Sequence, residues 1–338
     1  YSPLLEAIPS FSFLIVLWAG GWRVVNGHLT LGEFVMFQAY LNMLVWPLIA
    51  FGWVSNLIQR GKASLARLQE ILEEPPLIQA PARPVPLPNP VRGEVEFSQV
   101  TVTYGETNAL DRITMRIPAG ATAAIVGRTG AGKSTLLALI PRLFDPQSGQ
   151  VKLDGIDVRE LDPTELRREV AIVPQETFLF SDTIANNIAL GAPGAPREAI
   201  ERAARRAGLA PDLSEFPQGL DTLLGERGVT LSGGQRQRTA IARALVSEAR
   251  ILILDDALSA VDTVTEDRIL HELAQLRTGR TTILVSHRVS TVRDADIIFV
   301  LEAGRIAEQG THHELLTRGG YYAELHQKQM LEEALESA

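Results

Sequence analysis

The chain has 338 residues, contains no cysteine and carries a formal net charge of −8. Its hydrophobic fraction of 46% and charged fraction of 21% are typical of a folded protein, which excludes long disorder, collagen-like repeats and disulfide-stapled secreted scaffolds. A chain of this length forms roughly two domains. Nucleic-acid binding depends on clustered basic residues, so the acidic balance and the scarcity of lysine argue against a nucleic-acid partner.

Two apolar stretches open the chain, at residues 3–25 and 34–57. At ~20 residues, each stretch is long enough to cross a bilayer as a helix. No Lys or Arg lies between them at residues 26–30, whereas Arg60, Lys62 and Arg67 follow the second stretch, and such charges favour the cytoplasmic side. The pattern predicts a helical hairpin in the cytoplasmic membrane with its short loop outside. The alternative is a buried hairpin of a soluble protein, which the flanking charges disfavour.

Proline marks the end of this first region. The helical pattern continues past residue 57 with interspersed charges and stops at Pro75 and Pro76. More prolines follow as far as Pro90, a composition that favours an extended, semi-rigid spacer. We therefore expect four parts, namely a transmembrane domain fragment at 1–74, a linker at 75–92, a second domain at 93–327 and a C-terminal helical tail at 328–338.

The pattern beyond Gly93 changes to short strands and longer helices, which indicates an α/β domain. Strands are expected at 95–104 and 121–126, and two apolar runs at 251–254 and 281–285 read as further buried strands. Both of these runs end in polar residues, as parallel strands do where their carboxyl ends carry chemistry.

The strand at 121–126 runs into a glycine-rich loop that satisfies G-x-x-x-x-G-K-[ST] and precedes a helical run. In such a loop the backbone N–H groups surround phosphates, the lysine reaches the terminal phosphates and the hydroxyl ligates Mg²⁺. We therefore expect an ATP-binding segment with Mg²⁺ held by Ser134. Its residues are Gly127, Arg128, Thr129, Gly130, Ala131, Gly132, Lys133, Ser134 and Thr135.

A second phosphate-binding candidate opens a later helix. Its residues are Leu231, Ser232, Gly233, Gly234 and Gln235. The serine and the exposed glycine N–H groups at a helix start form an anion site suited to the γ-phosphate of a nucleotide. A flexible Ser/Gly loop is the alternative interpretation.

The apolar run at 251–254 ends in Asp255 and Asp256. Asp255 is expected to hold Mg²⁺, usually through water, and Asp256 to orient or deprotonate the attacking water. Apolar runs that end in Asp are common, so the roles given to this one depend on the phosphate loop upstream.

Together these motifs resemble those of the nucleotide-binding domain of ATP-binding cassette (ABC) proteins. In that family the pentapeptide at 231–235 is the signature motif, which binds ATP held by the opposite subunit. The resemblance covers 93–327 and implies an α/β P-loop NTPase cassette with an antiparallel β subdomain and a helical subdomain. It also implies that ATP and Mg²⁺ are the ligands.

The resemblance assigns roles to residues that would otherwise pass as ordinary. Tyr104 matches the aromatic residue that stacks on adenine, Gln175 the glutamine that contacts Mg²⁺, and His287 the switch histidine that contacts the γ-phosphate. Alone, these would be a strand aromatic, a surface glutamine and a structural histidine. Ser259 to Asp262 resembles the D-loop that crosses between subunits, and residues 225–228 resemble a segment that exporters use to sense their membrane helices.

The hairpin ahead of the cassette resembles the last two helices of an exporter half-transporter. A full half carries six spans, so about four more are expected before Tyr1. The resemblance implies ATP-driven export across the cytoplasmic membrane, with a second half-transporter and the lipid bilayer as partners. The cargo would be a small molecule such as a drug, a lipid or a peptide.

One departure from the family pattern concerns the catalytic base, because hydrolysing cassettes have Glu where this chain has Asp256. Asp is one methylene shorter, which withdraws the carboxylate by ~1.5 Å, and a misplacement near 1 Å costs on the order of 100-fold in rate. We therefore expect this chain to own a degenerate ATP site and to complete the hydrolytic site of a different partner. Two alternatives remain open, a homodimer in which Asp256 is the base and an ATP-gated regulatory subunit with little turnover.

Overall fold

The computed structural model describes residues 2–225, 231–275 and 279–336, and it divides into two compact units, Tyr1–Pro76 and Leu77–Ala338. The first unit consists of α1 (Ser2–Val25) and α2 (Leu31–Leu72). Thr30 caps α2 through a reciprocal capping box with Glu33, which explains where the helix starts. The helix ends just before the two prolines, as expected of residues that cannot continue it.

In the first unit the described side chains are largely exposed, as suits contact with lipid or with other helices. None of the α2 residues is buried, and Trp18 and Trp46 are 80% and 77% exposed. Among the described residues, α2 is the one helix long and apolar enough to cross a membrane, whereas the described apolar part of α1, Ser10–Val25, is shorter. The helical hairpin is therefore as predicted. The described apolar part of its first helix, Ser10–Val25, is shorter than the ~20 residues that cross a bilayer.

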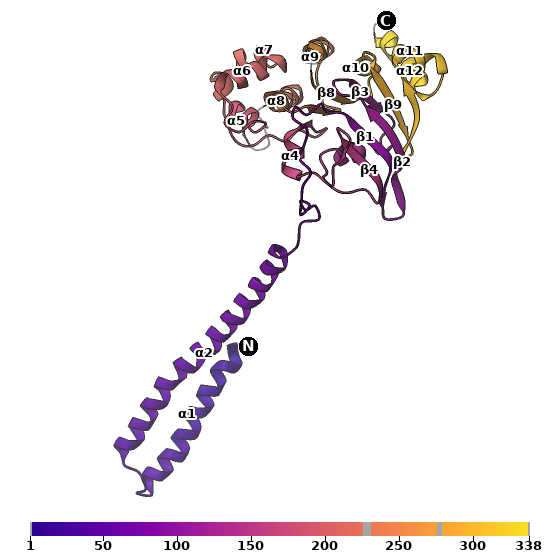
Figure 1. Cartoon of the computed structure of the whole chain (residues 1–338). Helices are drawn as coiled ribbons and strands as arrows, with labels where there is room; N and C mark the ends of the chain where they lie inside the picture. The colour runs from indigo at the N-terminus through magenta and orange to yellow at the C-terminus, as the bar shows by residue number, and fades with distance from the viewer. Residues whose placement is uncertain (1, 226–230, 276–278, 337–338) are drawn as a thin grey trace. The chain divides into compact units, whose positions relative to one another are not determined.

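The second unit contains two sheets (Figure 1). The antiparallel sheet has the order β2 (Thr107–Ile117), β1 (Val95–Tyr104), β4 (Ser148–Leu153) and β5 (Ile156–Asp157). The larger sheet has the order β10 (Arg305–Gly310), β9 (Ile297–Glu302), β3 (Thr122–Val126), β8 (Thr281–Val285), β7 (Ile251–Asp255) and β6 (Val170–Val173). In the larger sheet only the β9–β10 pair is antiparallel, and a shared apolar core joins the two sheets.

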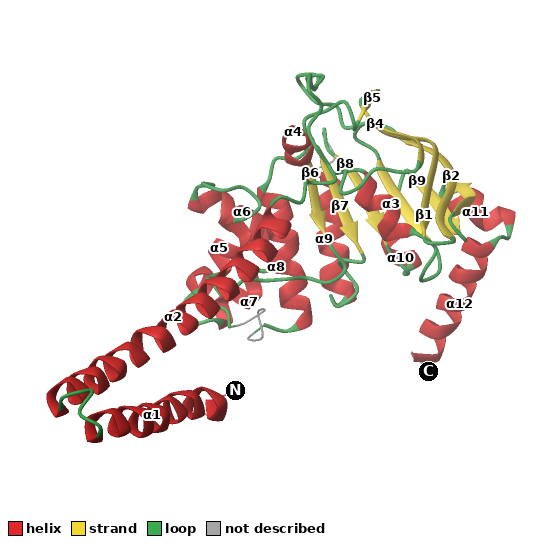
Figure 2. Cartoon of the chain, turned by 90° about the horizontal axis from the view of Figure 1, so that it is seen from below, coloured by secondary structure: helices red, strands yellow, loops and turns green. Residues whose placement is uncertain are grey.

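The helices of this unit are short and fall into two groups. Those around the sheets are α3 (Lys133–Leu139), α4 (Pro163–Arg168), α9 (Thr263–Gln275), α10 (Val289–Val292), α11 (His312–Arg318) and α12 (Tyr321–Glu336). The others are α5 (Ile184–Ala189), α6 (Arg197–Arg206), α7 (Ala210–Glu215) and α8 (Gly233–Val246), with a 3₁₀ turn at Gly219–Asp221. Figure 2 shows the second group gathered beside β6, the edge strand of the larger sheet.

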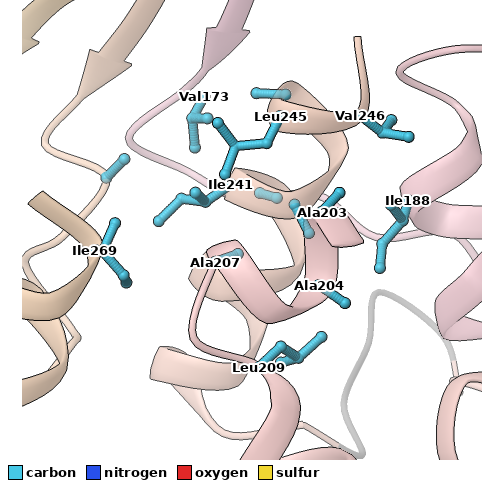
Figure 3. Packing of buried hydrophobic residues seen from close by; sticks show 14 of the residues in the cluster. Val173, Ile188, Ala203, Ala204, Ala207, Leu209, Ile241, Leu245, Val246 and Ile269 are labelled. Carbon is cyan, nitrogen blue, oxygen red and sulfur yellow. The ribbon is translucent and has the colours of Figure 1, made fainter. Parts of the chain in front are cut away.

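This helical group has a core of its own. Ile241 and Leu245 of α8 pack with Ala203 and Ala204 of α6 and with Ile188 of α5 (Figure 3). The small alanines let α6 approach α8 closely, and the buried apolar area stabilises the group. The antiparallel β and helical subdomains implied by the family resemblance are both present.

The proline-rich segment was predicted at 75–92 as an extended, semi-rigid spacer, and in the structure its later part packs on the second unit. Leu87 and Val91 contact the sheet core, and the Val85 N–H donates to the Glu160 carbonyl at 2.8 Å. Apolar side chains between the prolines make this packing favourable. At the other end of the unit, α12 runs from Tyr321 to Glu336, so the described part of the tail expected at 328–338 continues a helix that begins earlier.

Candidate nucleotide-binding site

The order of the parallel strands brings the predicted chemistry to one edge of the larger sheet. β3, which leads into the glycine-rich loop, lies beside β8, and β8 lies beside β7. Asp255, the last residue of β7, is in register with Val285 at the end of β8. Parallel strands end at the same edge, so the loop, the two aspartates and the segment with His287 meet there.

The glycine-rich loop adopts the conformation that a phosphate-binding loop needs. Gly132 has φ of 101°, and a Cβ there would lie 2.4 Å from the Ala109 carbonyl oxygen, so only glycine fits. Lys133 opens α3, and its ammonium donates to the carbonyls of Gly127 at 2.8 Å and Arg128 at 2.9 Å. Burial lowers the pKa of Lys133, while the nearby Asp255 and Asp256 carboxylates act in the opposite direction.

Ser134 and Asp255 supply oxygen atoms suited to a magnesium ion. The Ser134 hydroxyl donates to Asp255 Oδ2 at 3.0 Å. Burial raises the pKa of Asp255, with Asp256 adding to the effect, and a buried carboxylate of this kind is stabilised by a cation. No group of three His, Asp or Glu residues in the described part of the chain could hold a metal. Magnesium accepts such a sparse site because it keeps several waters and binds substrate phosphates.

Asp256 and His287 form a contact at the mouth of this site. His287 Nδ1 lies 3.0 Å from Asp256 Oδ1, and the side chains are 61% and 16% exposed respectively. Asp256 has φ of 49°, a left-handed conformation that aspartate tolerates better than most residues. Its N–H donates to the Val285 carbonyl at 2.9 Å, which ties the turn after β7 to the end of β8. This geometry keeps the carboxylate at the strand edge.

A cleft of about 530 Å³ gathers these groups. The predicted residues that line it are Tyr104, Gly127, Arg128, Thr129, Gly130, Gly132, Lys133, Ser134, Thr135, Gln175, Asp255, Asp256 and His287. Ala131 does not line it, because its methyl group is buried in the sheet core at 5% exposure. The Tyr104 ring, at the end of β1, is 57% exposed and so is open to stacking.

Four further residues line the cleft that the sequence motifs do not include. They are Ala109, Val285, Ser286 and Tyr321. Val285 and Ser286 could have been predicted from the sequence, because they lie between the expected strand at 281–285 and His287. Tyr321 begins α12, far from every motif in the sequence, and only the packing of that helix brings it to the cleft.

The signature residues lie elsewhere and do not line this cleft. Ser232 caps α8 through a reciprocal capping box with Gln235, with bonds of 3.2 Å and 2.9 Å, and Leu231 is buried beneath it. A Cβ at Gly234 would lie 2.9 Å from the Ala260 carbonyl, and Gly233 also approaches Ala260. The start of α8 therefore depends on the close approach of its two glycines to Ala260.

The signature helix and the predicted D-loop are joined within the chain. Gln237 donates to the Ser259 hydroxyl at 3.1 Å and accepts from the Ala260 N–H at 2.9 Å. Asp262 accepts from the Thr265 N–H at 2.9 Å, a bond that lowers the pKa of this carboxyl. The segment predicted at 225–228 lies outside the described residues apart from Gly225.

Comparison with known proteins agrees with this geometry. Residues 110–259 match the model of the ABC transporter family, and residues 1–48 match that of the ABC transporter transmembrane region. The chain is 43% identical over 340 residues to the multidrug resistance-like ATP-binding protein MdlA of Escherichia coli, covering 100% of this chain and 57% of MdlA. It is also 43% identical over 328 residues to the ATP-dependent lipid A-core flippase of Desulfotalea psychrophila, covering 97% of this chain and 57% of the flippase.

Among solved structures, a bacterial Atm1-family ABC exporter with ATP bound is similar with a TM-score of 0.83 and 41% identity, over 96% of this chain and 58% of that chain. The chain thus spans somewhat more than half the length of the relatives it matches. Both of its regions, the helical hairpin and the cassette, match the corresponding parts of the same proteins. The chain therefore belongs to the ABC transporter family.

Proposed function

We propose that the cleft binds ATP with Mg²⁺ and that the chain acts as one half of an ATP-driven exporter. The observation that carries the proposal is the convergence of the phosphate loop, Asp255, Asp256, Gln175 and His287 on one cleft at the strand edge. Lys133 binds the terminal phosphates, Ser134 and Asp255 hold Mg²⁺, and Tyr104 stacks on adenine. Bound Mg²⁺ would neutralise charge on the phosphate oxygens.

The separation of the signature from the cleft supports a two-chain site. At the start of α8, Ser232 is exposed and Gly233 to Gln235 are half-buried, a position suited to an anion, yet these residues do not line the chain's own cleft. An ATP molecule held by a second half-transporter supplies that anion. Closure of two cassettes around ATP then moves the membrane helices between inward- and outward-facing states, and hydrolysis resets them.

The second chain is a different one, and this chain's own site turns over slowly. Asp256 has a shorter side chain than the glutamate of hydrolysing cassettes, so its carboxylate reaches less far toward an attacking water. The partner's ATP, lying against this chain's intact signature, would be hydrolysed by the partner's own base. Relatives named for multidrug resistance and for lipid A-core flipping favour an amphipathic drug or a lipid as cargo over a peptide.

A homodimer in which Asp256 is the base is the second candidate. The His287 contact favours it, because it keeps the carboxylate in the cleft where an attacking water would lie.

Native mass spectrometry of the full-length protein, extracted from its own membrane, separates the two. Association with a different half-transporter that has Glu after its Mg²⁺-binding Asp is the expected result. Association with a second copy of itself would overturn the asymmetric assignment and favour Asp256 as the base.

A further inference from the structure

Helix α12 contacts the nucleotide site at two points that the proposed function does not use. Tyr321, its first residue, lines the cleft, and the Arg128 guanidinium of the phosphate loop lies 5.6 Å from the centre of its ring. Gln329 hydrogen-bonds the backbone that follows β8, at His287 and Val289. Eight residues of helix span ~12 Å, so one rigid element reaches from the phosphate loop to the switch segment.

The Gln329 amide is matched to the backbone it meets. Its Nε2 donates to the His287 carbonyl at 2.6 Å, and its Oε1 accepts from the Val289 N–H at 2.8 Å. Val289 is the first residue of α10, and the N-cap residue Arg288 provides no side-chain cap. Gln329 therefore satisfies one of the N–H groups left open at the start of that helix.

Arg288, which follows His287, is held by a bond within the segment and by a buried carboxylate from α9. The Arg288 N–H donates to the Ser286 hydroxyl at 3.0 Å, and the Arg288 guanidinium pairs at 2.9 Å with Glu266, whose side chain is 2% exposed. The His287 imidazole is itself mostly exposed and contacts Asp256. Its position relative to a nucleotide thus depends on how its own backbone is held, and Gln329 holds that backbone.

Gln329 can perform this task because α12 is firmly seated. Tyr322 is fully buried, and its hydroxyl lies 2.8 Å from His312 Nδ1. Its ring shares a core with Val292 of α10 and Ile298 of β9, and Figure 1 shows α12 beside these elements. A side chain on such an element positions its partner more accurately than one on a loop.

We propose that α12 is a positioning helix for the γ-phosphate side of the site and that Gln329 is the positioning residue that sets where His287 stands. The inference rests on the proposed function of the cleft as an ATP site. ADP lacks the phosphate that His287 would contact. Loss of the Gln329 bonds should therefore weaken ATP binding and spare ADP binding.

The test uses the full-length protein with whatever subunit co-purifies, labelled with 8-azido-ATP or 8-azido-ADP and resolved by chain. Gln329→Ala is expected to weaken ATP binding in this chain's site roughly tenfold and to leave ADP binding unchanged. Gln329→Glu keeps the acceptor for Val289 but loses the donor to His287, so its effect should be intermediate. Gln327→Ala, on the exposed side of the same helix, is the matched control and should change neither.

Coupling to His287 decides whether the effect is positional. In a His287→Ala background, Gln329→Ala should have no further effect on ATP binding. A full additional effect there, or an equal loss of ATP and ADP binding from Gln329→Ala alone, would overturn the proposal, because either would mean that α12 acts only by packing. If the unsubstituted chain takes up neither label, the proposed function itself is wrong.

Discussion

The nucleotide cleft and the signature helix, which the proposed exporter brings together between chains, are stabilised by different means. The cleft is assembled from the ends of β3, β7 and β8, whose register depends on a core shared by distant segments. The signature is the start of one helix, capped by Ser232 and Gln235 three residues apart. A change in the cleft should therefore act on ATP held by this chain. A change in the signature should act on ATP held by the partner.

Replacement of Lys133 by Ala is expected to have the largest effect, and it tests the cleft. The ammonium is the group proposed to bind the terminal phosphates, so without it ATP binding to this chain should fall at least about 100-fold. Photolabelling resolved by chain measures this. Lys152→Ala on β4, which does not line the cleft, is the control, and undiminished labelling of Lys133→Ala would refute the site.

Ser232→Ala tests the signature side. Loss of the hydroxyl should lower the ATPase rate of the assembled complex on the order of 100-fold, because a preorganised donor to the partner's ATP is removed. ATP labelling of this chain should persist.

The same change also removes a helix cap, at about 1 kcal/mol of stability. Thr183→Ala removes the matching cap of α5, where the hydroxyl accepts from the Asn186 N–H at 3.0 Å, and so serves as the control. Equal ATPase losses in both variants would mean that the signature serine is only a cap.

Asp256→Glu tests whether the chain's own cleft is degenerate. The longer side chain restores the reach of a catalytic carboxylate, so turnover at this site should rise about tenfold. Vanadate trapping of 8-azido-ADP on this chain reports that turnover. Asp255→Glu adds the same methylene to the proposed Mg²⁺ ligand and should not raise trapping. A fall in trapping for Asp256→Glu would favour Asp256 as a working base.

Asp212→Asn should have the smallest effect, confined to the signature side. Asp212 accepts three hydrogen bonds from Arg238, two at 2.9 Å and one at 3.2 Å, and one from Gln235 at 3.1 Å. The Asp212 and Arg238 side chains are 15% and 11% exposed. Asparagine keeps one acceptor, so stability should fall by about 1 kcal/mol. Denaturant unfolding measures this change, and ATP labelling of the cleft should be unaffected. A loss of labelling would mean that the cleft and the signature helix are coupled within one chain.

Some of the fold and site was predictable because its signals are local. The capping pattern at Ser232, the glycine-rich loop between a strand and a helix, and the apolar run ending in Asp255 each lie within a few residues of sequence. The packing of the proline-rich segment was not predictable, because it depends on where Leu87 and Val91 meet the sheet core. The burial of Ala131 has the same kind of cause, since a methyl group in a loop carries no signal of its direction.

The amino-acid sequence alone predicted the division into an apolar hairpin and an α/β cassette, the family, and the residues proposed to bind phosphate and Mg²⁺. It did so because periodicity, glycine spacing and strand-ending carboxylates are written in neighbouring residues. Three features arise only when the chain has folded: the contact between Asp256 and His287, the position of Tyr321 in the cleft, and the hydrogen bond from Gln329 to the His287 carbonyl. Those contacts join segments separated by long stretches of chain, and they exist only once β7, β8 and α12 have packed together.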